Sequence, residues 1–248
     1  MLACYSKDRD STIPIYPLQA SQLESWLAQQ PARWQEWVRA NKFKAESGSL
    51  CRLPAEDGRL AAVLFGINNL DDFWIYGSLP ISLPEGHYRL ELEDPSSEQW
   101  QRILMAWGLG AYQFSLYREA NLPRSTLFVP PSCDYSELEI LVSSIYLLRD
   151  LINTPAEAMG PAELSEAALK VADEFGANVK LIVGDELLKE NYPLIHAVGR
   201  ASSEAPRLID LRWGDEKNPR VTLVGKGVCY DTGGLSIKTT AGMLLMKK

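Results

Sequence analysis

Two lysines and one aspartate lie close together in a glycine-rich stretch near the end of the sequence. Lys226 precedes Asp231 by five positions, and Lys238 follows Asp231 by seven. Four glycines surround these side chains, at Gly225, Gly227, Gly233 and Gly234. Because glycine carries no side chain, other groups can approach the backbone closely. Such a loop could bind phosphate, hold a cation or stabilise an oxyanion.

Three interpretations of this stretch compete. A phosphate-binding P-loop is disfavoured, because Lys226 precedes the glycine pair instead of following it. A glycine-rich turn with solvated lysines is the plainest alternative. The third is a metal-centred hydrolytic site, in which Asp231 bridges metals and Lys226 binds as a neutral amine. Lysine is an unusual ligand, since its ammonium has no lone pair until a metal holds it deprotonated. The residues alone leave the last two interpretations open.

The elements that would position these side chains are predicted from the pattern of apolar residues. The run 221–224 predicts a strand that leads directly into the loop, where α/β proteins place their ligands. Further strands are predicted at 179–183, 194–198 and 207–213, and helices at 185–190 and from 241 onward. This alternation is typical of a sheet flanked by helices.

The first half of the chain predicts a separate unit with its own core, since six of the seven tryptophans precede residue 108. Its predicted elements are two helices within 21–43 broken at Pro31, a hairpin of 50–53 and 60–65 around Asp57-Gly58, strands at 73–76 and 88–93, and a helix after Ser96. The proline-rich segment 121–135 predicts a linker. Helices are then expected from 137 to about 151 and from Gly160-Pro161.

Composition narrows the class of protein. The chain has 248 residues, of which 46% are hydrophobic and 23% charged, which excludes a disordered or low-complexity protein. The formal net charge of −7 argues against a general nucleic-acid-binding protein. No apolar stretch approaches the ~20 residues of a membrane span. The charged N-terminal residues do not fit a signal peptide, so we expect a cytoplasmic protein without a membrane partner.

Histidines and cysteines exclude the commonest zinc sites. His87 and His196 are 109 residues apart, so the sequence contains no H-E-x-x-H motif. The four cysteines are far from one another and read as reduced thiols. A metal site in this chain would therefore depend on other ligands.

Two segments resemble a known family. The string LVGKGVCYDTGGLSIK, continued by TTAGMLLMKK, resembles the signature of the cytosolic leucyl aminopeptidases, the M17 metallopeptidase family. RDLINTPAEAMGPAEL, residues 149–164, resembles the stretch that opens the catalytic domain of that family. The resemblance implies an α/β protein with a small N-terminal α/β domain, residues 1–130. Residues 131–248 would be the first part of a helix-flanked mixed-sheet (αβα) metallopeptidase domain.

The resemblance also implies roles for individual residues. Lys226 would bind one of two divalent metal ions, Mn²⁺ or Zn²⁺, and Asp231 would bridge both. Lys238 would be the catalytic lysine that stabilises the tetrahedral oxyanion, and Met246 would line the pocket for the first side chain of the substrate. The family hydrolyses N-terminal residues, often leucine, from peptides and assembles as a hexamer. Membership of the family also predicts that 221–224 is a central sheet strand, with Lys226 and Asp231 pointing into one pocket.

The sequence departs from the family pattern at its end. The further metal-binding carboxylates and a catalytic arginine of the family fall beyond Lys248. Residues 219–248 carry five basic side chains against Asp231 alone, a local charge that should repel divalent ions. We therefore expect this chain alone to be inactive and not to hold metals stably. The alternative is a non-catalytic assembly or binding module, or a pseudoenzyme, derived from the family.

Overall fold

The computed structural model describes residues 2–117 and 125–247, and these form two compact units. Unit 1 comprises Met1–Leu148 and unit 2 comprises Arg149–Lys248. Each unit is described by itself. Within the described residues, no helix combines the length and the apolar character that a membrane crossing requires.

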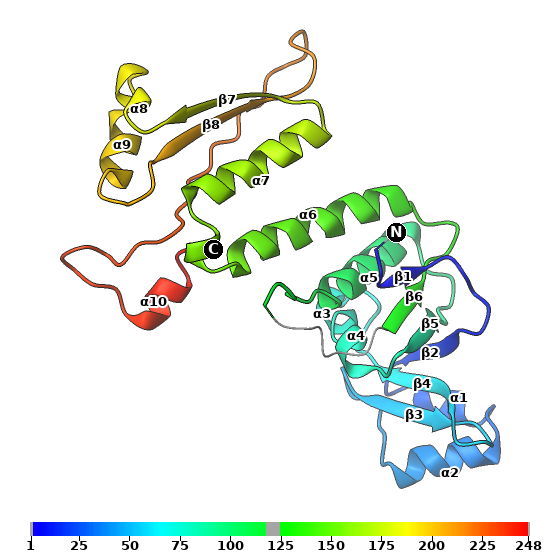
Figure 1. Ribbon diagram of the computed structural model, residues 1–248. Helices are drawn as coiled ribbons and strands as arrows, with labels where there is room; N and C mark the ends of the chain where they lie inside the picture. Colours follow the sequence, from blue (N-terminus) through cyan, green and yellow to red (C-terminus); the bar gives the residue numbers. More distant parts are fainter. Residues whose placement is uncertain (1, 118–124, 248) are drawn as a thin grey trace. The chain divides into compact units, whose positions relative to one another are not determined.

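Unit 1 contains a six-stranded sheet (Figure 1). The strands are β1 (Tyr5–Ser6), β2 (Ile13–Leu18), β3 (Leu50–Pro54), β4 (Leu60–Gly66), β5 (Gly86–Leu90) and β6 (Ser125–Phe128). Their order across the sheet is β1-β6-β5-β2-β4-β3. All neighbouring pairs are parallel except β3 and β4, which form an antiparallel hairpin.

Helices connect these strands. They are α1 (Leu23–Leu27), α2 (Ala32–Ala40), α3 (Phe73–Tyr76), α4 (Leu79–Ser82), α5 (Ser97–Gly110) and α6 (Tyr135–Asn153). Local chemistry explains several of their ends. Pro31 precedes the first residue of α2, and Ser96 starts α5 by exchanging hydrogen bonds with Gln99 in a capping box.

The sheet of unit 1 is buried on both faces, as β4 shows. Val63 and Phe65 belong to one cluster of buried side chains, to which α3, α4, α5 and α6 also contribute. Ala62 and Leu64, which alternate with them, belong to a second cluster formed with α1 and α2. Because successive side chains of a strand point to opposite faces, this division means that helices cover both sides. Unit 1 is a three-layer αβα structure.

Unit 2 is built around one pair of strands that two short helices connect. Its elements are the short 3₁₀ helix η1 (Ala156–Ala158), α7 (Pro161–Glu174), β7 (Asn178–Val183), α8 (Glu186–Lys189), α9 (Pro193–Gly199), β8 (Arg207–Arg212) and α10 (Thr240–Leu244). β7 and β8 pair antiparallel. Only three hydrophobic side chains of this unit are classed as buried among the described residues: Ala172, Ile182 and Leu187. The core of unit 2 is therefore small.

Several predicted elements are confirmed. Helices lie on both sides of Pro31, and β3 and β4 form the hairpin around Asp57-Gly58. The helices predicted after Ser96 and from Gly160-Pro161 are α5 and α7. The predicted strand at 88–93 corresponds to β5, which begins two residues earlier and ends three residues earlier. In each case a turn, cap or proline marks the boundary in the sequence.

Two short apolar runs were predicted with the wrong structure. Residues 73–76 form the helix α3, and 194–198 lie within the helix α9. A run of four or five apolar residues has no periodicity that separates a strand from a helical turn. Pro193 at the first position of α9 is the local signal for a helix.

The linker predicted at 121–135 is also wrong where the structure describes it. Residues 125–128 form β6, which lies between β1 and β5 in the parallel part of the sheet. The flanking prolines conceal this strand in the sequence. Residues 121–124 lie outside the described residues.

The boundary between the two units along the chain lies within α6. Leu138 and Val142, in the N-terminal half of this helix, are buried in the core of unit 1. The contacts therefore divide the chain at Leu148, whereas the sequence predicts domains of 1–130 and 131–248. Contacts group residues by packing and not by independent folding, so the boundary after residue 130 stays a prediction.

The buried core of unit 1 predicts a large effect for one truncation. Leu104 of α5 is completely buried, so Leu104→Ala should lower the free energy of unfolding by about 2–5 kcal/mol. Urea unfolding followed by tryptophan fluorescence measures this, since six of the seven tryptophans lie in unit 1. Ile140→Ala on α6, where the side chain is 61% exposed, is the matched control and should have little effect. Equal losses for both variants would contradict this packing.

A buried thiol predicts a pH dependence. Burial raises the pKa of Cys4 from 9.0 to about 11. Because the folded state holds this proton more tightly, its contribution to stability is complete below pH 9.0 and is lost as the pH rises through 11. Urea unfolding across this interval should show stability falling less steeply in Cys4→Ala than in the parent chain. Parallel pH profiles would refute the assignment.

Candidate functional site

Three of the four predicted site residues, Lys226, Asp231 and Lys238, lie in a long irregular segment between β8 and α10, and Met246 follows α10. Asp231 is the centre of this segment. One carboxylate oxygen, Oδ1, accepts a hydrogen bond from the Gly233 N–H at 2.8 Å, and the other, Oδ2, forms an ion pair with the Lys238 ammonium. The Lys238 N–H donates to the Thr232 carbonyl at 2.7 Å and closes the loop. The structure thus brings Asp231 and Lys238 into direct contact.

Backbone geometry explains the glycine pair of this loop. Gly233 has φ +92°, which side chains rarely tolerate, and a Cβ there would lie 2.3 Å from the Ser236 carbonyl oxygen. Gly234 also has a positive φ, of +66°. The two glycines let the chain fold back so that Lys238 reaches Asp231.

The electrostatics of the loop favour an ionised carboxylate. The hydrogen bond from Lys238 and then that from the Gly233 N–H lower the pKa of Asp231, and the charge of Lys226 adds a smaller contribution in the same direction. The carboxylate is partly exposed, with 47% of its side chain accessible. Asp231 is therefore a negatively charged group that a cation can reach.

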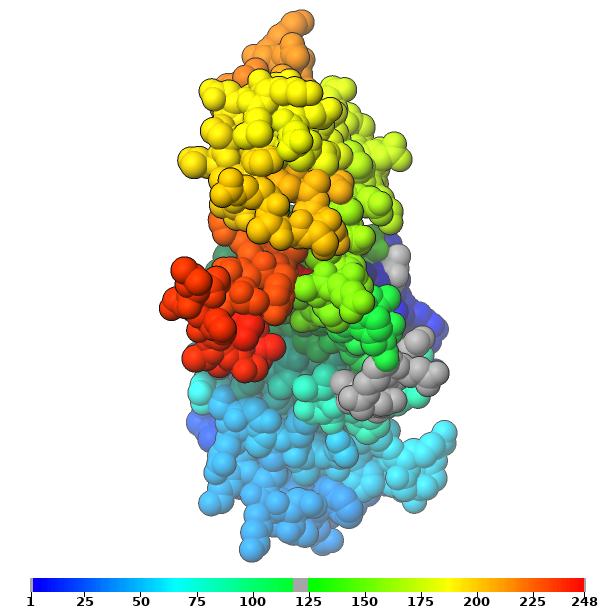
Figure 2. All heavy atoms as spheres, turned by 60° about the vertical axis from the view of Figure 1, so that its left-hand side comes forward, coloured from blue at the N-terminus to red at the C-terminus, as the bar shows by residue number. Residues whose placement is uncertain are grey.

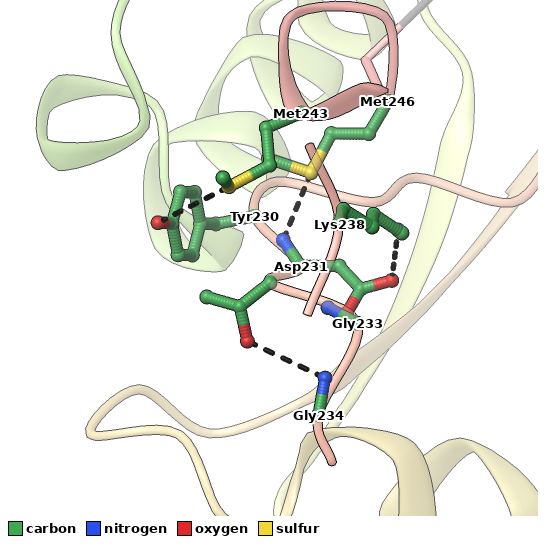
Figure 3. A network of polar contacts seen from close by, with 8 residues as sticks. Tyr230, Asp231, Gly233, Gly234, Lys238, Met243 and Met246 are labelled. Carbon is green, nitrogen blue, oxygen red and sulfur yellow. Dashed lines mark hydrogen bonds and ion pairs between the residues drawn. The ribbon is translucent and has the colours of Figure 1, made fainter. Parts of the chain in front are cut away.

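The segment that follows the loop folds back onto it. Thr239 caps α10 through a hydrogen bond from the Gly242 N–H at 3.2 Å. The Asp231 N–H then donates to the Met246 sulfur at 2.9 Å, which places Met246 beside Asp231. The structure therefore gathers three of the four predicted site residues, Asp231, Lys238 and Met246 (Figure 3).

Lys226 is placed differently. It is exposed, and the strand predicted before it does not form: Val221, Leu223 and Val224 are 82%, 92% and 93% exposed. The prediction that 221–224 is a central sheet strand is therefore wrong for this structure. A strand needs a neighbour to satisfy its backbone, and in the described part of unit 2 the sheet consists of β7 and β8. Figure 2 shows the end of the chain, coloured red, at the surface.

Sequence reasoning missed two contacts that hold the loop. Thr232 supplies the carbonyl that binds Lys238, and its own hydroxyl accepts a 3.4 Å hydrogen bond from the Gly234 N–H. Lys247 donates from Nζ to the Thr154 carbonyl at 2.5 Å, which ties α10 to the segment after α6. The order Asp-Thr-Gly-Gly is a turn signal that predicts the first contact. No sequence signal predicts the second, which joins residues 93 positions apart.

The residues present do not by themselves fit a centre of two divalent metals. Asp231 is the one carboxylate in the loop, and two lysines surround it. Throughout residues 2–117 and 125–247, no group of three or more His, Cys, Asp or Glu side chains is arranged to hold a metal ion. Divalent cations need several oxygen or nitrogen ligands. The loop offers one part of such a set.

Comparison with known families matches both parts of the chain. Residues 13–130 match the family described as "M17 aminopeptidase, N-terminal domain". Residues 146–248 match "Cytosol aminopeptidase family, catalytic domain", and this match contains the whole candidate site.

Individual relatives agree with these matches. A cytosol aminopeptidase from Coxiella burnetii, solved by crystallography, is 47% identical and superposes with a TM-score of 0.92, over 99% of this chain and 54% of that one. A probable cytosol aminopeptidase of Corynebacterium efficiens is 34% identical over 148 residues, 55% of this chain and 29% of the relative. The bottromycin maturation enzyme BotP, solved in complex with Mn, is 24% identical with a TM-score of 0.74, over 93% of this chain and 51% of that one, and shows the fold alone.

The likeness confirms the resemblance and the α/β fold class inferred from the sequence. The structure adds that the sheet of unit 1 is largely parallel. The chain spans about half the length of the solved relatives, and its alignment covers about a third of the curated ones.

The loop geometry predicts the effect of adding one methyl group. Gly233→Ala should prevent the turn, because its φ is positive and its Cβ would meet the Ser236 carbonyl. The Lys238 N–H, which donates to Thr232, should then exchange with solvent several-fold faster, as measured by hydrogen–deuterium exchange. Gly225→Ala is the control, since a Cβ there meets nothing within 4 Å. Unchanged exchange in Gly233→Ala would show that this turn does not form in solution.

Proposed function

We propose that this chain, which belongs to the M17 aminopeptidase family, forms part of a dinuclear-metal aminopeptidase. The complete enzyme would hydrolyse N-terminal residues, leucine among them, from peptides. The observation that carries this proposal is the pairing of Asp231 with Lys238 in the glycine loop, within the segment that matches the catalytic domain. An ionised carboxylate next to a lysine combines a metal ligand with a group that can stabilise negative charge.

Each site residue takes a role in this proposal. Lys226 and Asp231 are metal ligands. Lys238, once released from Asp231, donates a hydrogen bond to the oxyanion that forms when water attacks the scissile carbonyl. Met246 lines the pocket for the first side chain of the substrate. Its contact with the Asp231 N–H supports this role by placing the thioether beside the Asp231 backbone.

The proposed cofactors are two divalent ions, Mn²⁺ or Zn²⁺, in the complete enzyme. We propose that the 248-residue chain alone does not hold these ions stably and is inactive, because the loop has one carboxylate and two lysines and the remaining ligands must come from elsewhere.

The proposed partners are peptide substrates and further copies of the complete protein in a hexamer, without nucleic acid or membrane. The proposed location is the cytoplasm, which the name cytosol aminopeptidase of several curated relatives supports. The net charge of −7 supports the absence of nucleic acid.

A second candidate function is a non-catalytic assembly module or pseudoenzyme. Exposed apolar side chains in unit 2 favour association with another surface. Leu194, Val198 and Trp213 are 80%, 79% and 76% exposed. This second candidate differs from the first because it predicts that the protein hydrolyses no peptide, even when the remaining ligands are supplied.

The first test uses the chain as it is. Incubated with leucine 4-nitroanilide and Mn²⁺ or Zn²⁺, the purified 248-residue protein should release no nitroaniline above the metal-only background. Release that a chelator abolishes would show that the chain holds a complete site and would overturn the proposed inactivity.

The second test restores the remaining ligands. Residues 1–248 are fused to the part of the Coxiella burnetii enzyme that lies beyond the matched stretch, and the fusion should hydrolyse the anilide in a chelator-sensitive way. In this fusion Lys238→Ala should lower kcat by about 10²- to 10³-fold, as loss of an oxyanion donor does. Lys217→Ala, which removes an exposed lysine outside the loop, should leave kcat unchanged. A folded fusion without activity would favour the pseudoenzyme.

A further inference from the structure

Unit 1 contains a cavity of about 480 Å³ that is separate from the glycine loop. It lies between the C-terminal end of α2 and the edge strand β3, two elements that pack together (Figure 1). Its walls include Trp37, Lys42, Phe43, Lys44, Glu46 and Arg52. Pockets for small molecules are of this size and typically combine aromatic walls with a few charged groups.

The cavity is basic in an acidic part of the chain. Residues 1–150 carry 13 basic and 19 acidic side chains, a balance of −6, yet the walls hold three cations and one carboxylate. The Arg52 guanidinium already has a hydrogen-bond partner, since it donates to the Ser82 carbonyl at 2.7 Å. Lys42 and Lys44 are exposed, and among the described residues neither ammonium has an ion pair or a hydrogen bond. Once Glu46 offsets Arg52, two positive charges remain.

Lys42 occupies a backbone position that normally belongs to glycine. Its φ is +53°, and its N–H donates to the Arg39 carbonyl at 3.0 Å. The Phe43 N–H donates to the Val38 carbonyl at 3.2 Å. These two bonds form the Schellman motif that ends α2, in which the left-handed residue is usually glycine. They also satisfy the carbonyls of Val38 and Arg39 near the end of the helix.

The loop that carries the lysines is held rigidly. Ala45 also has φ +53° and is buried, and its carbonyl packs against Gly66, where a Cβ would lie 2.7 Å from the Ala45 oxygen. The Gly48 N–H donates to the Gly66 carbonyl at 2.8 Å, and the Gly66 N–H donates to the Ser49 carbonyl at 2.9 Å. Backbone strain of this kind concentrates at binding sites, where the surrounding structure maintains it.

Trp37 provides a fixed aromatic wall. It is 44% exposed, while its Nε1–H donates to the Arg52 carbonyl at 2.9 Å. Trp34 donates in the same way to the Pro54 carbonyl at 3.0 Å. The two indoles cover outward carbonyls of the edge strand β3, which disfavours addition of a peptide strand at this edge. A small planar molecule that stacks on Trp37 is compatible with both hydrogen bonds.

We propose that the cavity between α2 and β3 binds a small aromatic phosphate, whose ring packs on Trp37 and whose dianionic phosphate pairs with Lys42 and Lys44. The two ammonium groups match the two charges of a phosphate monoester. The strained backbone at Lys42 is retained because the side chain reaches the phosphate from that position.

Isothermal titration calorimetry of the 248-residue chain tests this proposal with phenyl phosphate as the probe. Phenyl phosphate should bind roughly tenfold or more tightly than phenol, which lacks the charge, and than inorganic phosphate, which lacks the ring. AMP is a fourth probe: tighter binding than phenyl phosphate supports a nucleotide as the natural ligand, and weaker binding supports a simple aryl phosphate. Phenyl phosphate that binds no tighter than inorganic phosphate overturns the proposal.

Lys42→Gly separates binding from folding. Glycine relieves the positive φ, so the variant should unfold at an equal or higher urea concentration than the parent while its affinity for phenyl phosphate falls roughly tenfold. Lys44→Gln should lose affinity similarly. Lys7→Gln, which removes the third lysine of unit 1, is the control and should bind as the parent does. Parent-like affinity in Lys42→Gly contradicts the proposed role of this residue.

Discussion

A β-strand is stable only when neighbouring strands satisfy its backbone and helices or loops cover its side chains, and this constraint governs the whole chain. Unit 1 meets it. Its sheet has helices on both faces, and the tryptophans of α2 protect the exposed edge at β3. The described part of unit 2 meets it only for β7 and β8. Residues 221–224 have the apolar character of a buried strand, and in this structure they are exposed.

The same constraint shapes the candidate site. With no strand before it, the glycine loop is organised by its own contacts: Asp231 binds Lys238 and the Gly233 N–H, and Met246 returns to the Asp231 backbone. The Lys238 ammonium forms an ion pair with the Asp231 carboxylate, the group that would bind metal ions in the proposed function. A single carboxylate between lysines is an unfavourable place for two divalent cations. The contacts within the loop thus fix its local conformation, but binding two divalent cations there would require further acidic groups.

Features that depend on neighbouring residues could be predicted from the sequence. The capping box at Ser96, the break at Pro31 and the turn at Asp57-Gly58 each act within a few residues. The grouping of Asp231 with Lys238 is of the same kind, because two glycines with positive φ bring them together.

Features that depend on distant partners could not be predicted. The strand β6 is defined by β1 and β5, and the contact of Lys247 with Thr154 spans most of unit 2. The strand predictions were wrong for a different reason at 73–76 and 194–198, because short apolar runs are compatible with both helix and strand. Helix or strand is decided there by packing, which the local sequence does not contain.

The central proposal is that this chain carries the lysine-rich part of a two-metal site, and that its described residues do not supply the acidic groups needed to hold the ions. Electron paramagnetic resonance of Mn²⁺ titrated into the 248-residue protein tests it most directly, because bound and free Mn²⁺ give distinct signals. The account predicts only weak binding, in the millimolar range, that Asp231→Asn changes little. Micromolar binding of two ions per chain that Asp231→Asn abolishes would contradict it.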